Sequence, residues 1–316
     1  MTEELTVTEE LTVTVVGAGG KMGMRISASL ERAKLDRTSY TTRYVETSPA
    51  ARDRVRAAGR ELSEAMEAVP RSDVVILAVP DVLLGEISTR IVPAAKPGAV
   101  ILTLDPAAAY AGVLARRADL HLAVAHPCHP SVFLERTSAE EWADTFGGVA
   151  APQDVVAAIE PGGTPDDTVP YDRAARERAE KVVRAMYAPV LDVHWVTVEQ
   201  LAFLEPTLVE TITCMISGLL KEALKETVNT VGVPEAAARA MLFGHTQVAL
   251  TNSLRGSNPF SEACLIAMDY GRQAIITEDW KRVFDQAELD RVIARMLRIE
   301  KVNRPGTGSP AAAVTT

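Results

Sequence analysis

LTVTVVGAGGKMG, residues 11–23, joins an apolar β-branched run to a glycine-rich turn and then to a helical pattern. Such a turn presents backbone N–H groups at a helix start to a pyrophosphate, and glycines allow the phosphates to approach where a Cβ would collide. The spacing of Gly17, Gly20 and Gly23 fits G-x-x-G-x-x-G better than the strict dinucleotide pattern, which needs glycine at Met22. The stretch therefore predicts a strand–turn–helix unit that binds a dinucleotide.

The cofactor type is indicated by Glu46, which follows the next strand-like run. A carboxylate roughly 20 or more residues past the glycines binds the adenosine ribose hydroxyls. Its charge repels a 2′-phosphate, so we expect NAD, although the neighbouring Arg43 and Arg52 leave NADP as an alternative. The residues predicted to bind the cofactor lie in the turn or at strand ends: Gly17, Gly19, Gly20, Lys21, Met22, Gly23, Glu46, Val79 and Pro80.

The composition is that of an ordinary globular protein, with 316 residues, 47% apolar and 24% charged. This length predicts about two domains, since one hydrophobic core rarely grows past ~250–300 residues. A net charge of −9 argues against nucleic acid or an anionic membrane as a partner. Three scattered cysteines are too few for a disulfide framework, and neither a signal peptide nor an uninterrupted bilayer-spanning apolar run is expected. We therefore expect a cytoplasmic protein.

Strand-like and helix-like segments alternate over residues 11–193, which predicts an α/β fold with an N-terminal Rossmann-like, doubly wound parallel sheet. Continuous apolar runs at 74–79, 99–104 and 122–125 are typical of strands buried on both faces, and a further strand is expected at 149–159, before a helix at 171–187. Ligands bind beyond the carboxyl ends of such strands. The breaks expected to line that crevice are Pro80-Asp81, Asp105-Pro106 and His126-Pro127.

Residues 194–302 predict an all-helical C-terminal domain for substrate binding and dimerisation. Thr197 and Gln200 have capping-box spacing, a kink is expected at Pro206, and further helices are expected at 234–254 and 260–273. The apolar positions exceed what one short domain can cover, which favours a homodimer; they include Met215, Ile216, Leu219, Leu220 and Met241.

Both chain ends are predicted to lack fixed structure. The tail, residues 303–316, is of low complexity and is expected to be disordered. The first copy of a tandem EELTVT repeat, residues 3–8, is expected to be frayed, because only the second copy leads into the glycine turn.

Two histidines, His126 and His129, stand in the run AHPCHP at the end of a buried strand. The two prolines of this run fix φ and stiffen the loop, which suits the aiming of imidazoles at a reacting atom. We predict catalytic roles for both histidines, with structural hydrogen bonding as the alternative. Cys128 between them is expected to pack rather than to react, since no third residue marks it as activated.

Three carboxylates, Glu199, Glu205 and Glu210, lie on or beside the kinked helix. On an unbroken helix Glu199 and Glu210 share a face, while the kink makes the direction of Glu205 less predictable. We predict a divalent metal site of His129, Glu199 and Glu205, whose donors suit Mg²⁺, Mn²⁺ or Zn²⁺; solvated helix residues are the alternative.

The remaining candidates carry less weight. His121 and His194 flank strands and are expected to be structural, while His245 is expected on a helix at the dimer interface. Arg255, in a polar loop, has two interpretations, a bidentate clamp for a substrate carboxylate and a surface residue.

The chain resembles the 6-phosphogluconate dehydrogenase-like superfamily in GAGGKMG, in Glu46, in LAVPD at 77–81 and in its helical second domain. Within that superfamily, AHPCHPSVF at 125–133 and VEQLAFLEPTLVET at 198–211 resemble the D-apionate oxidoisomerases most. The general-acid lysine of hydroxyisobutyrate-type dehydrogenases has no counterpart at a comparable position, since Lys221 comes late.

The resemblance implies NAD-dependent oxidation of a branched sugar acid, D-apionate, and rearrangement of its carbon skeleton to 3-oxo-isoapionate in one site. Two alternatives stay open: a hydroxy-acid or prephenate-like dehydrogenase without rearrangement, and a non-catalytic NAD-sensing module. The expected partners are a small-molecule sugar acid and a second copy of the chain.

Overall fold

The computed structural model describes residues 10–35, 40–163 and 172–304, which group by contact into two compact units. The first unit comprises Met1–Ser131, Glu135–Ala202 and Asp290–Thr316, and the second comprises Val132–Leu134 and Phe203–Leu289. The division falls at Ala202 instead of the predicted 193, and the chain returns to the first unit from Asp290 on. One reason for this return is the hydrogen bond from the Tyr110 hydroxyl to the Asp290 carboxylate, 2.5 Å long.

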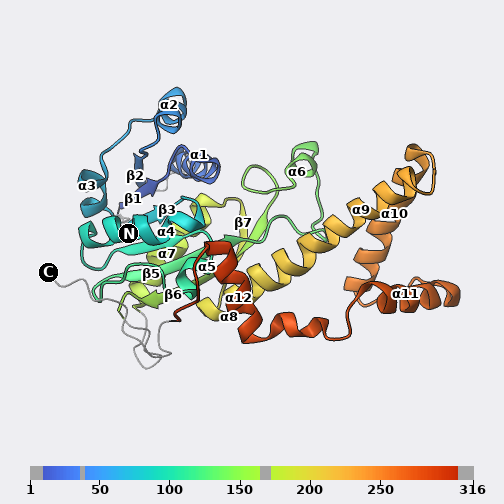
Figure 1. Ribbon diagram of the computed structural model, residues 1–316. Helices are drawn as coiled ribbons and strands as arrows, with labels where there is room; N and C mark the ends of the chain where they lie inside the picture. Colours follow the sequence, from blue (N-terminus) through green and yellow to red (C-terminus); the bar gives the residue numbers. More distant parts are fainter. Residues whose placement is uncertain (1–9, 36–39, 164–171, 305–316) are drawn as a thin grey trace, which may run out of the picture. The chain divides into compact units, whose positions relative to one another are not determined.

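The first unit is built on a seven-stranded sheet of order β2-β1-β3-β4-β5-β6-β7 (Figure 1). Every residue of β3 and β4 is buried, which explains why all of these residues except Thr103 are apolar. The strands are β1 (Leu11–Val16), β2 (Tyr40–Val45), β3 (Val74–Leu77), β4 (Val100–Thr103), β5 (His121–Pro127), β6 (Gln153–Pro161) and β7 (Val190–Trp195). The sheet and its helices confirm the predicted Rossmann-like fold.

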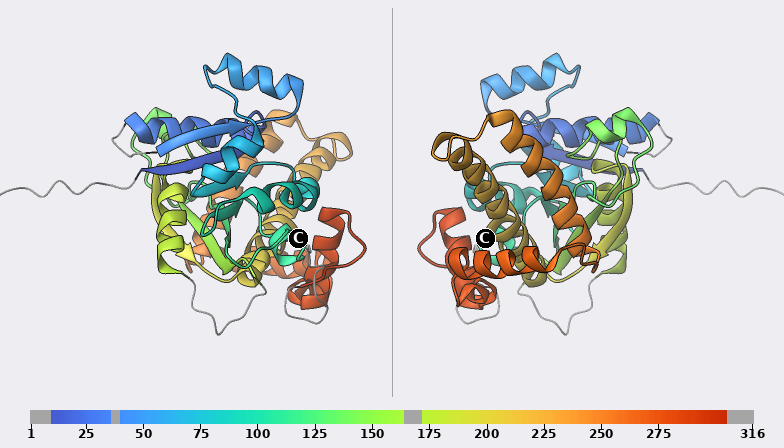
Figure 2. Two further views of the ribbon diagram at one scale, coloured as in Figure 1. Left: turned by 90° about the vertical axis from the view of Figure 1, so that its left-hand side faces the viewer. Right: turned by 90° about the vertical axis from the view of Figure 1, so that its right-hand side faces the viewer.

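Helices cover both faces of this sheet. The chain passes from β1 to β2 in one direction and from β3 to β4 in the other, so right-handed crossovers put α1 and α4 on opposite faces. Helix α7 packs beside α1, and Figure 2 shows it across the sheet from α4. The helices of this unit are α1 (Lys21–Leu35), α2 (Pro49–Ala57), α3 (Ala65–Ala68), η1 (Val69–Arg71), α4 (Asp81–Ile91), η2 (Val92–Ala94), α5 (Ala107–Tyr110), α6 (Ala139–Ala143), α7 (Arg173–Met186) and α8 (Val198–Ala202), together with most of α12 (Gln286–Leu297).

Strand β6 departs from the predicted parallel sheet, because it pairs antiparallel with β5. The chain between them, residues 128–152, contains only the five-residue helix α6 and no crossover that could bring it back to the amino end of the sheet. It therefore re-enters the sheet from the carboxyl end of β5. Strand β7 then runs parallel to β6.

The second unit is helical, as predicted, but its first helix differs from the expectation. Instead of a kink at Pro206, residues 203–214 form a π-helix that continues α8. Pro206 has no N–H to donate, and the wider turn lets the Thr211 hydroxyl donate to the Pro206 carbonyl at 2.7 Å. The helices of this unit are η3 (Phe203–Cys214), α9 (Met215–Asn229), α10 (Glu235–Leu254), α11 (Glu262–Ile275) and η4 (Trp280–Phe284).

The first two residues of the tail that was predicted to be disordered, 303 and 304, have fixed positions in the structure. The amide of Asn303 donates to the carbonyl of Ala111 at 3.2 Å, and Arg304 lies 3.7 Å from the carboxylate of Asp290. These contacts fix the first two residues of that segment. Residues 305–316 and the first repeat copy, residues 3–8, lie outside the described residues.

One helical run, Val198–Asn229, is long and apolar enough to cross a membrane by length and composition alone. Its most apolar part has a mean hydropathy of 1.3. Glu205 and Glu210 interrupt its apolar residues, so it is not the uninterrupted apolar run whose absence the sequence predicted. Only 17% of its apolar window is buried, so much of its surface is open.

Candidate active site

The glycine turn follows β1, at the point where the strand order reverses and an open α/β sheet binds its ligand. The Gly17 amide donates to the Val45 carbonyl at 2.9 Å, which ties the turn to the end of β2. A Cβ on Gly23 would lie 2.1 Å from the Gly17 carbonyl oxygen, so only glycine allows α1 to start this close to the strand. Gly17 also lies against Ala78 and Val79, which brings the end of β3 to the same place.

Glu46, the residue predicted to bind the ribose, also braces this turn. Its carboxylate accepts hydrogen bonds from the amides of Gly19 at 3.0 Å, Thr47 at 2.9 Å and Ser48 at 3.1 Å. A carboxylate has about four lone-pair sites, so capacity for a further donor remains. Arg52 donates to the Glu46 carbonyl at 2.9 Å.

A second group of polar residues lies where β4 and β5 end. The Nδ1 atom of His126 is 3.1 Å from the Leu104 carbonyl oxygen, and because a carbonyl only accepts, Nδ1 carries the proton. The Nε2 lone pair is therefore available to a ligand. Burial lowers the pKa of His126, and the neighbouring Asp105 carboxylate opposes that shift. A lowered pKa favours the neutral imidazole, which is the form that binds a metal.

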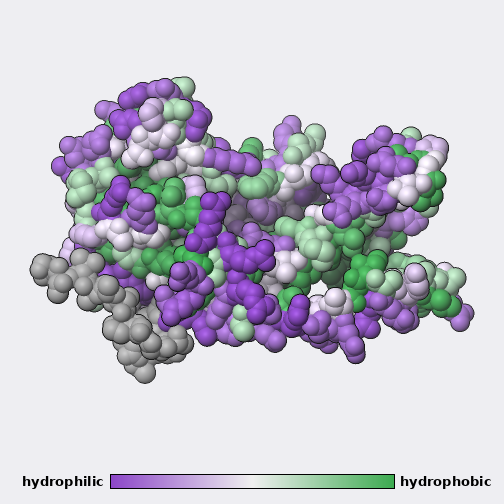
Figure 3. Space-filling model, in the orientation of Figure 1, coloured by the Kyte–Doolittle hydropathy of each residue, from purple (hydrophilic) through white to green (hydrophobic). Residues whose placement is uncertain are grey.

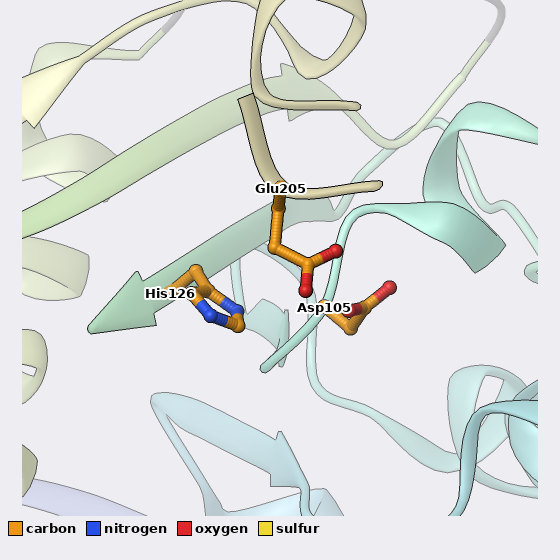
Figure 4. Close-up of side chains that lie close together, drawn as sticks. All are labelled: Asp105, His126 and Glu205. Atoms are coloured by element: carbon orange, nitrogen blue, oxygen red, sulfur yellow. The ribbon is translucent and has the colours of Figure 1, made fainter. Parts of the chain in front are cut away.

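Glu205 joins these two residues in Figure 4, where its carboxylate is drawn beside Asp105 and His126. It lies three residues beyond α8 on the same continuous helix, and the capping box of α8 forms as predicted, with Thr197 and Gln200 exchanging hydrogen bonds of 3.0 and 3.1 Å. Ligand atoms of Asp105, His126 and Glu205 all lie within 4.8 Å of one another. Two carboxylates and one imidazole suit Mg²⁺, Ca²⁺, Mn²⁺ or Zn²⁺.

His129 is oriented by a second carbonyl. Its Nδ1 atom is 2.8 Å from the Phe146 carbonyl oxygen, and its ring lies 4.4 Å from the Phe146 ring and 6.4 Å from that of His126, measured between centroids. As in His126, the carbonyl places the proton on Nδ1 and leaves the Nε2 lone pair to accept a proton.

The structure brings only one of the three predicted metal ligands into the group. Glu205 is in the group, whereas His129 is not among its members. Glu199 is exposed, with its carboxylate 3.9 Å from Arg304, and Glu210 is also exposed. Glu199 is not among the members of the group either, because α8 turns this residue toward solvent.

Asp105 is the site residue that sequence reasoning missed. The sequence predicts that it lines the crevice as part of a strand break but assigns it no ligand role, yet it is a carboxylate directly after a buried strand and at the same sheet edge as His126. That signal was sufficient to find it. Its Oδ1 atom also accepts the Ala107 amide at 2.8 Å, which fixes the carboxylate at the start of α5.

The other candidates are not members of this group. His121 and His194 are near Asp172 and Asp154 at 3.7 and 3.6 Å, which agrees with structural roles. The guanidinium of Arg255 lies 4.6 Å from the Phe133 ring centroid. Desolvation and the neighbouring Asp154 raise the pKa of the Cys128 thiol, which disfavours a nucleophilic role.

Comparisons with known proteins agree with this architecture. A family model for the phosphogluconate dehydrogenase (decarboxylating) C-term matches residues 134–297. A D-apionate oxidoisomerase of Pectobacterium atrosepticum is 57% identical over 93% of this chain and 98% of its own, and one of Cupriavidus necator is 38% identical over 90% and 98%. A crystal structure of a semialdehyde dehydrogenase NAD-binding protein from Cupriavidus necator, in complex with calcium and NAD, superposes with a TM-score of 0.83; it is 37% identical and covers 91% of this chain and 100% of its own. The chain therefore belongs to the D-apionate oxidoisomerase family of oxidoreductases.

Proposed function

We propose that this enzyme binds NAD, oxidises D-apionate at C2 and rearranges the carbon skeleton to the isomerised 3-oxo acid, in the cytoplasm. The observation that carries the proposal is the group of Asp105, His126 and Glu205, a metal-type donor set at the sheet edge that also carries the glycine turn. The names of the relatives support the substrate, and the calcium and NAD in the Cupriavidus necator structure support the two cofactors.

The two cofactors supply the chemistry that side chains lack: NAD accepts a hydride, and a divalent ion acts as a Lewis acid that stabilises alkoxide charge. The residues of the chain do the rest. Amides of the glycine turn and Glu46 hold the dinucleotide, and Asp105, His126 and Glu205 would hold the ion. The Phe146 carbonyl orients the His129 ring and leaves its Nε2 lone pair available. His129 uses this lone pair to take the proton from the substrate hydroxyl as a general base.

The first prediction concerns the metal. We expect exhaustive chelation with EDTA to abolish formation of the rearranged acid, and Mg²⁺ or Mn²⁺ to restore it. Asp105→Asn and Glu205→Gln should each lower product formation by at least about tenfold, since even outer-shell partners of a metal cost 10- to 100-fold. Product formation is followed by NMR, NADH by absorbance.

Glu199→Gln is the matched control, because that carboxylate is exposed and paired only with Arg304 among the described residues. It should keep normal turnover. Full activity after chelation, with elemental analysis confirming metal removal, would favour a metal-free acid–base enzyme. Formation of NADH with an unrearranged product would favour the simple dehydrogenase.

The second prediction tests the base. His129→Asn should reduce kcat by roughly 100-fold, as is typical for loss of a general base, with little change in melting temperature. The side chain is half-buried in a loop and is not part of the hydrophobic core, so its removal leaves the core intact. Normal turnover of this variant would show that another residue removes the proton.

The third prediction concerns the cofactor. NAD should exceed NADP in kcat/KM by at least about tenfold, on the order of 1.4 kcal/mol, because the Glu46 carboxylate repels a 2′-phosphate. Glu46→Gln should narrow this ratio, since it removes the charge while keeping an acceptor for the turn amides. Equal use of both cofactors by the unmodified enzyme would contradict the role of Glu46.

The fourth prediction concerns a soluble homodimer formed through the second unit. Helices α9 and α11 bury none of their residues and α10 buries only Ala238, while Ile266 and Leu254 are 67% and 71% exposed. Figure 3 shows green, hydrophobic side chains along these helices. Apolar surface of this extent marks an interface.

Light scattering should give twice the 34.0 kDa chain mass at micromolar concentration. Ile266→Asp should shift the protein toward monomer, whereas Met66→Asp, on an equally exposed residue of α3, should not. A monomer that sediments with lipid vesicles would instead assign the apolar face to a membrane.

A further inference from the structure

Arg25 and Arg32 connect the cofactor-binding helix to the loop that carries His129. They lie seven residues apart on α1, and therefore on the same face of that helix. Arg25 Nη2 donates to the carbonyl of Gly147, and Arg32 Nη2 donates to the carbonyl of Gly148 at 2.6 Å. Two successive carbonyls of the loop after β5 are thus held by two successive arginines.

The backbone at these carbonyls has a shape that only glycine adopts readily. Gly147 and Gly148 have φ of 77° and 81°, and a Cβ on Gly147 would lie 2.7 Å from the amide of the buried Gln153. The pair therefore turns the loop so that its carbonyls face α1. The cavity that remains there is about 10 Å³, room for one water at most, so no substrate enters between Arg25 and the loop.

Arg25 makes a second contact that Arg32 does not make. Its guanidinium carbon lies 4.4 Å from the centroid of the Phe146 ring, within cation–π range. Phe146 also contacts His129: its carbonyl accepts a hydrogen bond from Nδ1, and the two ring centroids lie 4.4 Å apart. Lys21 Nζ, also on α1, lies farther from the Phe146 ring centroid than Arg25 does, at 5.8 Å. Phe146 is therefore held by Arg25 while it holds His129.

His129 needs such support, because its φ of 61° is unfavourable for a residue with a Cβ. A conformation of this kind persists only where the surroundings fix it. Here the neighbours that fix it are the Phe146 ring and carbonyl, and these depend in turn on α1.

We propose that Arg25 is a positioning residue for His129, acting through Phe146, and that it sets the base relative to the helix whose first turn binds the dinucleotide. The consequence for catalysis rests on the proposed role of His129, whereas the positioning itself does not. The contacts of Arg25 go to Gly147 and Phe146, and not to His129 itself or to the glycine turn. Its removal should therefore lower kcat and leave the affinity for NAD unchanged.

The test compares Arg25→Met and Arg25→Lys with the matched control Arg32→Met, which removes one loop contact of the same kind from the same helix. Histidine labelled with ¹³C at Cε1 reports on the His129 ring, with its resonance assigned by its loss in His129→Asn. The Phe146 ring current shifts that resonance, and Phe146→Leu supplies the value without it. Steady-state kinetics with NAD and D-apionate give kcat and KM on the full-length enzyme.

Arg25→Met should move the His129 resonance toward its position in Phe146→Leu and lower kcat by roughly tenfold or more, because small misplacements of a catalytic group cost that much. KM for NAD should stay within about twofold, and Arg32→Met should leave kcat within about twofold and the resonance in place. Arg25→Lys should recover part of the rate, because the charge above the Phe146 ring remains.

An unmoved resonance in Arg25→Met, or an equal shift in Arg32→Met, would overturn the proposal. If His129→Asn keeps normal turnover, the role of His129 as a base fails, but the resonance still decides whether Arg25 positions the ring. Melting temperatures of all variants identify any general loss of structure.

Discussion

The parallel alignment of β1, β3, β4 and β5 is the constraint on which the site depends. Strands that run in one direction end at one edge, and the four strands here end in the glycine turn, in Val79, in Asp105 and in His126. Residues up to about 110 positions apart in the chain therefore lie at one edge as a consequence of strand pairing alone. The strands themselves are mostly apolar and buried, so the charged and imidazole groups lie just beyond their ends.

Backbone carbonyls then decide what the two imidazoles can do. The carbonyl of Leu104 accepts a hydrogen bond from Nδ1 of His126, and the carbonyl of Phe146 accepts one from Nδ1 of His129, so both rings present an Nε2 lone pair. The His126 ring lies beside carboxylates, however, and the His129 ring lies against a phenyl ring. The carboxylates beside His126 add negative charge that suits a cation. The phenyl ring beside His129 carries no charge, so the Nε2 lone pair of His129 stays available to accept a proton. The same tautomer is thus compatible with both proposed roles, metal binding at His126 and proton transfer at His129. Residue type alone does not distinguish these roles; the partner of each ring does.

Much of this arrangement was predictable from the sequence. The alternation of apolar runs and helical patterns predicted the sheet, and the breaks after its strands predicted which edge binds ligands. The antiparallel entry of β6 was not predictable in this way, because an apolar strand pattern has no direction. Asp105 was overlooked because it resembles a simple turn residue, although its place after β4 pointed to the site. The Arg25 contact joins residues 122 positions apart and depends on the φ angles of two glycines, which no periodicity encodes.

The choice among the three helix carboxylates depends on helix geometry. On a regular α-helix, Glu199 and Glu210 would share a face and Glu205 would point away from it. The structure has only one turn of α-helix, residues 198–202, before the i→i+5 spacing of η3 begins. Each π-helical turn contains more residues than an α-helical turn, so positions after Ala202 fall progressively behind the α-helical phase. Glu205 and Thr207 are then buried, at 5% and 1% exposure, while Glu199 and Glu210 face solvent. Because proline at 206 cannot donate the hydrogen bond that an α-helix requires there, the residue next to Glu205 helps to determine which of the three carboxylates is buried beside Asp105 and His126.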